Sequence, residues 1–140
     1  MKSILIDIDI ILDVLTKREP FFAPAANLWA KVEKKSIRAY LASHTITTLF
    51  YLIRKARGKA FAKRSIKGLL SVFEIAPVDK STLLLAIESD FADFEDAVQF
   101  AAAKRVNVDF IITRNIKDYK KSDIPVTSPD LFLASLELAD

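Results

Sequence analysis

Short apolar runs alternate along this chain with longer amphipathic segments. Strands separated by helices favour a parallel sheet with right-handed crossover connections. We therefore predict an α/β fold, a three-layer α/β/α sandwich around a central parallel sheet of four to five strands. The predicted strands cover residues 4–6, 39–42, 72–75, 110–113 and 126–128. The predicted helices cover residues 10–16, 24–34, 45–55 after a cap at Ser43 or Thr45, 59–70, 81–89, 93–105 and 131–138.

The composition suits one domain spanning residues 1–140, because 51% of the residues are hydrophobic and only two are glycine. The chain has no cysteine, which excludes disulfides, thiolate zinc sites and cysteine nucleophiles. The N-terminus does not have the pattern of a signal or transit peptide, and no apolar run is long enough to span a bilayer. We expect a cytoplasmic protein with no membrane association.

Charge is distributed unevenly along the sequence. Residues 34–73 contain no acid, whereas acids dominate residues 74–98. A basic surface attracts phosphate backbones, and an acidic pocket beside it would hold the cations that act on them. We therefore predict RNA as a partner and place Arg54 and Lys55 among the substrate-binding residues; the alternative is a solvated helical face. The basic residues of the first region are Lys34, Lys35, Arg38, Arg54, Lys55, Arg57, Lys59, Lys63, Arg64 and Lys67.

Asp7 directly follows the first apolar run, residues 4–6. A carboxylate at the end of a buried strand is costly unless a positive group meets it, and parallel sheets bind ligands at this edge. We predict that Asp7 binds a metal ion. Asp9 is better interpreted as a helix N-cap, and Asp13 as a solvated residue or a partner of Lys17.

A second group of acids comprises Asp90, Asp93, Glu95 and Asp96. On the predicted helix, Asp93 and Asp96 are neighbours along one edge. The helix dipole relieves only part of their repulsion, about 0.3–1 kcal/mol for each favourable charge. A divalent cation would relieve more, although an acidic helix start that merely complements the dipole is the alternative.

A third polar group follows the strand predicted at residues 110–113. Thr113, Asn115 and Asp118 would approach Asp7 and Asp96, because the carboxyl ends of parallel strands meet at one edge of the sheet. Three carboxylates there would form an oxygen-lined site suited to Mg²⁺ or Mn²⁺ rather than to zinc. Taken alone, residues 115–118 are equally typical of a turn.

In order and spacing, these stretches resemble the PIN domain family, which includes the toxin nucleases of VapBC-type toxin–antitoxin pairs. The matching segments are residues 6–13, 93–99 and 113–119. The resemblance implies an α/β/α fold and a Mg²⁺- or Mn²⁺-dependent endoribonuclease, with a cognate antitoxin that covers the acidic crevice. It implies that Asp7, Asp96 and Asp118 are catalytic. It implies Asp7, Asp96 and either Asp118 or Asn115 at the metal positions. We predict as metal ligands Asp7, Asp96, Asp118, Asp93 and Asn115. We predict as substrate-binding residues Thr48, Thr113, Arg114, Arg54 and Lys55.

The sequence departs from the family pattern at two positions. Thr48 stands where many relatives have a Glu, and Asn115 where some have an Asp. Because fewer carboxylates bind a cation less tightly, the alternative function is a weak or inactive PIN-like module that binds RNA or a protein partner. A haloacid-dehalogenase-type phosphatase is a third interpretation, based on Asp7 and Asp9, but the chain is short for it and no Gly follows Asp9.

Two further expectations concern the only histidine and the oligomeric state. A lone histidine at a helix start is more often structural than catalytic, so we expect His44 not to act as a general base. The abundance of apolar helix surface favours a homodimer.

Overall fold

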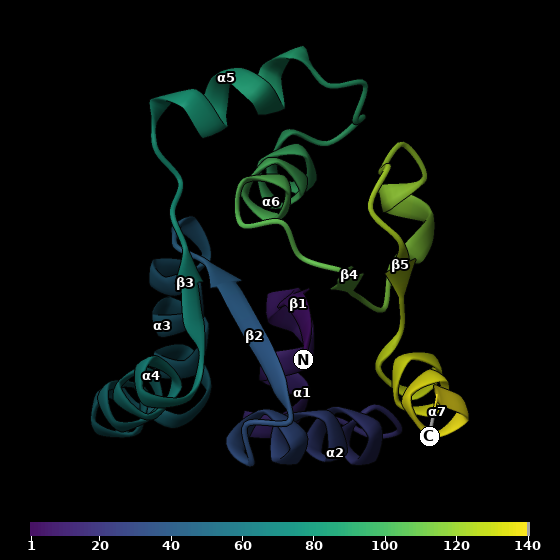
Figure 1. Cartoon of the computed structure of the whole chain (residues 1–140). Helices are drawn as coiled ribbons and strands as arrows, with labels where there is room; N and C mark the ends of the chain where they lie inside the picture. The colour runs from purple at the N-terminus through teal and green to yellow at the C-terminus, as the bar shows by residue number, and fades with distance from the viewer. Residues whose placement is uncertain (140) are drawn as a thin grey trace.

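The computed structural model, which describes residues 1–139, contains one five-stranded sheet in which all neighbouring strands are parallel (Figure 1). The strand order is β3-β2-β1-β4-β5. The strands are β1 (Lys2–Ile6), β2 (Ile37–Ala42), β3 (Glu74–Ala76), β4 (Phe110–Ile112) and β5 (Val126–Thr127). This arrangement confirms the predicted parallel sheet.

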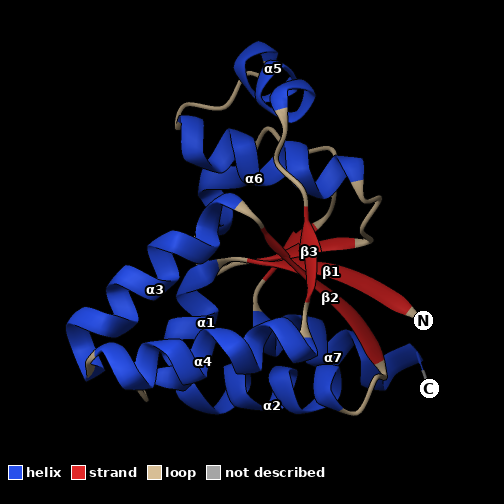
Figure 2. Cartoon of the chain, turned by 90° about the vertical axis from the view of Figure 1, so that its left-hand side faces the viewer, coloured by secondary structure: helices blue, strands red, loops and turns tan. Residues whose placement is uncertain are grey.

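Helices cover both faces of the sheet and make the predicted three layers (Figure 2). α6 lies on one face with α5 outside it, and the remaining α-helices lie on the other face. The helices are α1 (Ile8–Leu15), α2 (Phe22–Glu33), α3 (His44–Arg57), α4 (Lys59–Val72), α5 (Lys80–Glu88), α6 (Phe94–Arg105), the 3₁₀ helix η1 (Ile116–Tyr119) and α7 (Pro129–Ala139). Within residues 1–139, no helix is long and apolar enough to cross a membrane.

The central strand β1 is apolar throughout its buried part because both of its faces are covered. Ile4 and Ile6 pack into the core cluster on the side of α1 and α2. Leu5 points to the other side and packs with residues of α6. All three side chains are at most 2% exposed. Burial on both faces explains why the alternation of polar and apolar residues seen in half-exposed strands is absent here.

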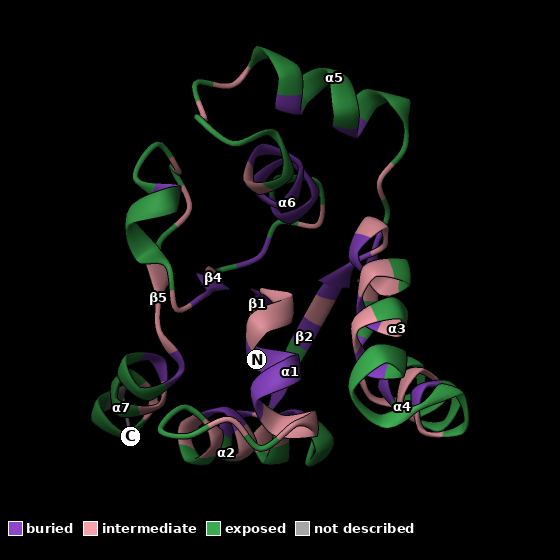
Figure 3. Ribbon diagram, turned by 180° about the vertical axis from the view of Figure 1, so that it is seen from behind, coloured by how far each residue is buried: buried purple, intermediate pink, exposed green. Residues whose placement is uncertain are grey.

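α6 is the buried helix of the thinner side of the sandwich (Figure 3). It is enclosed between the sheet and α5, and much of its buried surface consists of alanine side chains. These are Ala97, Ala101, Ala102 and Ala103. Small side chains let a helix lie close to the surface on which it packs. The N-terminal end of α6 is thereby held near the sheet.

The boundaries of several elements differ from the prediction. Val72 belongs to α4 rather than to a strand, because the Phe73 N–H donates to the Leu69 carbonyl and completes the last helical turn. β3 therefore begins at Glu74. Ser43 occupies the N-cap position of α3 as one of the two predicted caps, but its hydroxyl makes no capping hydrogen bond and instead accepts one of 3.0 Å from the Val78 N–H.

A buried ion pair joins α1 to the segment after β4. Asp13 is 1% exposed, and the Arg114 Nε lies 2.9 Å from its Oδ2. The Arg18 Nε lies 3.6 Å from Oδ1, and the Arg114 guanidinium stacks 3.9 Å from the centre of the Phe21 ring. The predicted partner Lys17 was therefore wrong, because the chain at Lys17 turns into a left-handed conformation (φ 51°) and other cations occupy the carboxylate.

We expect Arg114→Leu to lower the free energy of unfolding by about 2–4 kcal/mol, because Asp13 would remain buried with only the more distant Arg18 as its partner. Urea denaturation measures this loss. The double variant Asp13→Leu/Arg114→Leu should recover most of it, since neither charge is then left unpaired. Equal stability of the wild type and the Arg114 variant would contradict the structural role of this pair.

Candidate active site

A cavity of about 190 Å³ lies where β1 and β4 end. No lysine or arginine lines it, whereas four carboxylates do. We call it the carboxylate cavity, and its lining residues are Asp7, Ile8, Asp9, Thr45, Glu95, Asp96, Gln99 and Asn115. The N-cap of α1 is Asp7, so the prediction that Asp9 caps this helix is wrong; Asp9 lies in the first turn and faces the cavity.

The Asp7 carboxylate is held in place from the neighbouring strand. The Thr113 hydroxyl donates to Asp7 Oδ2 at 2.9 Å, and the Asn115 N–H donates to that hydroxyl oxygen at 3.1 Å. Although Asp7 occupies the N-cap position, its side chain makes no capping hydrogen bond. Burial raises the pKa of Asp7, and the Thr113 hydrogen bond opposes that rise. Thr113, which was predicted to bind substrate, is fully buried, and its hydroxyl is engaged with Asp7.

Asp96 lies opposite Asp7 at the start of α6. Partial burial raises its pKa to about 6, and the negative charges of Asp93, Asp7 and Asp118 add to the rise. The carboxylate of Asp93, which is exposed, accepts a 3.0 Å hydrogen bond from the Asp96 N–H and caps the helix. Asp93 thus fixes the first turn of α6, whereas Asp96 faces the cavity without a positive partner.

The other two predicted ligands come from the segment after β4. Asn115 lines the carboxylate cavity. Asp118, on η1, lines an adjoining groove of about 520 Å³, and Asp96 lines both hollows. Asp7 and Asp96 therefore share one cavity, while Asp118 reaches the site from the groove next to it.

Two buried polar groups beside the acids have no hydrogen-bond partner within residues 1–139. These are the Gln99 Oε1 atom and the Tyr119 hydroxyl, on side chains that are 3% and 2% exposed. Burial, together with the negative charges of Asp7 and Asp96, raises the pKa of Tyr119. Gln99 follows Asp96 by three residues, so it lies on the same helical face. Gln99 and Tyr119 fall inside the segments that resemble the family, and Glu95 belongs to the second group of acids, but none of the three was predicted as a site residue. Thr45 was predicted as a helix cap.

The cavity suits a hard divalent cation. No lysine or arginine shares the lining with its four carboxylates, and the available ligand atoms are oxygens, which Mg²⁺ and Mn²⁺ prefer. Within residues 1–139, no three acidic or histidine side chains are gathered closely enough to hold an ion by themselves. Mg²⁺ commonly takes one or two carboxylates and completes its shell with water and substrate phosphate. Asp7 and Asp96, with the Asn115 amide oxygen, fit that mode of binding.

The predicted substrate-binding residues of α3 do not reach the cavity. Thr48 is partly exposed and lies one turn beyond Thr45, outside the lining. Arg54 and Lys55 are exposed and lie roughly 14 Å along the helix axis from Thr45. His44 does not line the cavity either, and burial lowers its pKa.

Residues 3–117 match the family model described as the PIN domain. The chain belongs to the PIN domain family. This membership confirms the resemblance noted in the sequence and makes the phosphatase interpretation wrong. The PIN domain is 28% identical over 144 residues to Ribonuclease VapC1 of Aquifex aeolicus (strain VF5), covering 94% of this chain and 93% of that protein.

Solved structures of PIN domain toxins share the fold. VapBC2 from Rickettsia felis, bound to a DNA fragment from its promoter, aligns with a TM-score of 0.68 at 17% identity, covering 90% of this chain and 97% of that one. Mycobacterium tuberculosis VapC20, a Sarcin-Ricin loop cleaving toxin, aligns with a TM-score of 0.63 at 18% identity, covering 78% and 87%. At these identities the similarity establishes the architecture of the PIN domain.

We expect Asp96→Asn to raise the melting temperature of the metal-free protein at pH 7 by about 2–4 °C, a figure that allows for solvent screening of this partly exposed group. The folded state binds the Asp96 proton more tightly than the unfolded state, because the pKa rises from 3.8 to about 6 on folding. The ionised group therefore destabilises the fold increasingly as the pH rises from about 4 to about 6, and the destabilisation is complete above that range.

Thermal unfolding in the presence of a chelator, at pH 4 and at pH 7, measures this difference. The gain in stability should be small at pH 4, which is close to the unfolded-state pKa of 3.8 and where Asp96 of the folded protein is protonated. Glu137→Gln, at an exposed position of α7, is the matched control and should show no such pH dependence. A variant less stable than the wild type at pH 7 would overturn the interpretation of Asp96 as an uncompensated acid.

Proposed function

We propose that this PIN domain is a metal-dependent endoribonuclease, the VapC-type toxin of a toxin–antitoxin pair, acting in the cytoplasm. The observation that carries the proposal is the carboxylate cavity, where Asp7 and Asp96 face each other with no lysine or arginine in the lining. The relative named Ribonuclease VapC1 aligns along nearly the full length of both chains and supports the same activity.

Asp7, Asp96 and Asn115 would hold a Mg²⁺ or Mn²⁺ ion, and Asp118 would contribute from the adjoining groove. When bound, such an ion lowers the pKa of a water molecule and polarises the phosphate oxygens of a phosphodiester. The protein supplies the positioning: Thr113 orients the Asp7 carboxylate, and Asp93 fixes the helical turn that carries Asp96. The unpaired Gln99 Oε1 is available to accept a hydrogen bond from a water molecule in the cavity.

Asp7→Asn and Asp96→Asn should each reduce the rate of RNA cleavage in Mn²⁺ by at least roughly 100-fold, because each removes a charge that stabilises the cation at the reacting phosphate. Cleavage of a fluorescent single-stranded RNA measures the rate, with a chelator as the metal-free comparison. Glu137→Gln serves as a control that should retain the wild-type rate. RNA binding by the wild type without any metal-dependent cleavage would favour the alternative of a binding module.

We also propose a cognate antitoxin as a partner. The Rickettsia felis relative was crystallised as VapBC2. In this chain, the acids of the cavity lack positive neighbours, so a cationic side chain from a partner would meet a complementary charge there. Insertion of such a side chain would also block the cation and the RNA, which is the inhibition an antitoxin has to provide.

A homodimer is the oligomeric state we propose. α5 lies outside α6 and leaves a run of apolar side chains in solvent. Leu84 and Ile87 are 52% and 65% exposed, and Leu83 is 41% exposed. Exposed apolar patches of this kind mark interaction surfaces. A second copy of the chain would remove them from water.

We expect the wild type to have twice the monomer mass of 15.7 kDa in light scattering after gel filtration. Leu84→Asp/Ile87→Asp should halve that mass, because two carboxylates would be buried without partners in the interface. Leu131→Asp, at a 59% exposed position on α7, is the control. A wild type that remains monomeric at high concentration would contradict the proposed dimer.

A further inference from the structure

Three hollows form one continuous path across the surface beside the active site. The carboxylate cavity adjoins the groove of about 520 Å³, and the two share Asp96. That groove in turn adjoins a pocket of about 410 Å³, and these two share Asp90, Phe91 and Lys121. We call the hollow of about 520 Å³, lined by Lys117, Lys120 and Lys121, the lysine groove. We call the hollow of about 410 Å³, lined by Phe91 and Phe100, the aromatic pocket. A bound chain could pass from the reacting centre into both without leaving the surface.

One wall of the lysine groove carries free cations. Lys117, Lys120 and Lys121 lie on η1 or directly after it, and all three side chains are exposed. None of the three forms an ion pair within residues 1–139. Asp90 and Asp93 line the groove from the connection between α5 and α6, and Asp96 lines it from the first turn of α6. Asp118 lies on η1 between Lys117 and Lys120. All three lysines of the groove therefore come from η1 and the residues after it, and Asp118 is the one acid of the lining on that segment.

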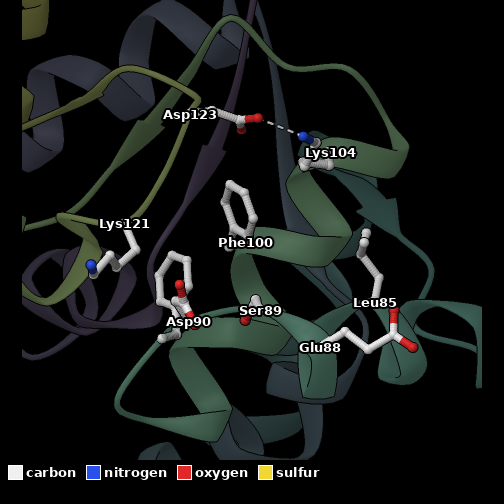
Figure 4. A pocket seen from close by; sticks show the side chains of 9 residues that line it. Leu85, Glu88, Ser89, Asp90, Phe100, Lys104, Lys121 and Asp123 are labelled. Atoms are coloured by element: carbon white, nitrogen blue, oxygen red, sulfur yellow. Dashed lines mark hydrogen bonds and ion pairs between the residues drawn. The ribbon is translucent and has the colours of Figure 1, made fainter.

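The aromatic pocket lies at the far end of this path (Figure 4). Phe91, which is partly exposed, stacks on Phe100 with ring centres 4.9 Å apart and an angle of 27° between the planes. The Phe91 ring also meets Tyr119 edge-on at 5.8 Å. At one end of the pocket, Lys104 pairs with Asp123 at 2.6 Å, and Lys121 lies at another side.

We propose that single-stranded RNA runs from the carboxylate cavity along the lysine groove and places one unpaired nucleobase in the aromatic pocket. This inference rests on the proposed ribonuclease activity and adds the binding path of the substrate. Lys117, Lys120 and Lys121 contact successive phosphates, and the base stacks against Phe91. The volume of the aromatic pocket, about 410 Å³, lies within the usual range of roughly 300–1,000 Å³ for a small-molecule site.

The order of chemical groups along the path matches a nucleic acid strand. Phosphates bind to lysine side chains, whereas bases stack on aromatic rings. Grooves that bind single strands have both kinds of side chain next to each other. A duplex keeps its bases stacked inside, so only an unpaired nucleotide can enter the pocket. The exposed lysines hold the phosphates at η1, and the base then reaches Phe91, which lines both the groove and the aromatic pocket.

The same geometry changes which basic residues are expected to bind the RNA backbone. The basic residues predicted for this role, Arg54 and Lys55, lie far along α3 from the cavity. The lysines of the groove, by contrast, border a hollow that Asp96 and Asp118 also line. The cations nearest to the reacting phosphate are therefore those of η1.

The test measures binding of a fluorescent single-stranded ten-nucleotide RNA to the full chain by anisotropy, at several salt concentrations. The Asp7→Asn background prevents cleavage during the measurement. Adding Lys120→Gln/Lys121→Gln should weaken binding about tenfold and lower the salt slope by about 1.4, the loss of two phosphate contacts on a single strand. Lys34→Gln/Lys35→Gln, which removes two exposed lysines just before β2 at the opposite edge of the sheet, is the matched control.

Phe91→Leu tests the base pocket and should weaken single-strand binding about fivefold or more while leaving the salt slope unchanged. The same RNA annealed to its complement should bind at least about fivefold more weakly than the single strand, because its bases cannot reach Phe91. If Phe91→Leu unfolds the protein, the Lys120→Gln/Lys121→Gln variant still tests the path, and the comparison of single strand with duplex still tests the base pocket.

The outcomes separate this inference from the proposed function. If the wild type cleaves RNA but the Lys120→Gln/Lys121→Gln and Lys34→Gln/Lys35→Gln variants bind RNA equally well, the proposed path is wrong and the proposed ribonuclease activity stands. Equal affinity for single strand and duplex would overturn the base pocket. Absence of any cleavage by the wild type would overturn the proposed function itself.

Discussion

The candidate site depends on the position of the Asp7 carboxylate at the end of the most enclosed strand. β1 lies between β2 and β4 and is covered on both faces, so the residue that follows it is partly buried. Ionising a carboxylate there is costly, and the structure offsets only part of the cost through the Thr113 hydroxyl. The rest of this cost can be offset by a cation bound beside Asp7, at the carboxyl ends of the strands.

The other buried acid of this region, near the C-terminal end of α1, does have cationic partners in the protein. Asp13, even less exposed than Asp7, is matched by Arg114 and Arg18. The chain thus places two cations beside one buried acid of this helix and none in the cavity lined by Asp7 and Asp9. Structural ion pairs are built from protein groups alone, whereas a site for an exchangeable ion must leave its carboxylates open. The contrast separates a residue that holds the fold together from residues that bind a ligand.

Much of this arrangement could be predicted from sequence because it follows from local patterns. The apolar run before Asp7, the acidic start at Asp93 and Asp96, and the strand before Asn115 each define one element and its polar end. The rule that parallel strands end at one edge then brings them together. The partner of Asp13 could not be predicted in this way, because Arg114 lies 101 residues away and no local signal links them. The same holds for the lysines of η1, whose relation to Asp96 exists only in the folded chain.

The alanines of α6 position the helix whose first turn carries Asp96. Ala102 and Ala103 pack on the sheet with Leu5 and Ile111, whereas Ala97 and Ala101 pack on Ala86 of α5. Small side chains on both sides let α6 lie close to the strands below it and to the helix above it. Side chains without any reactivity thus act as a spacer, and the placement of Asp96 is encoded in a packing surface.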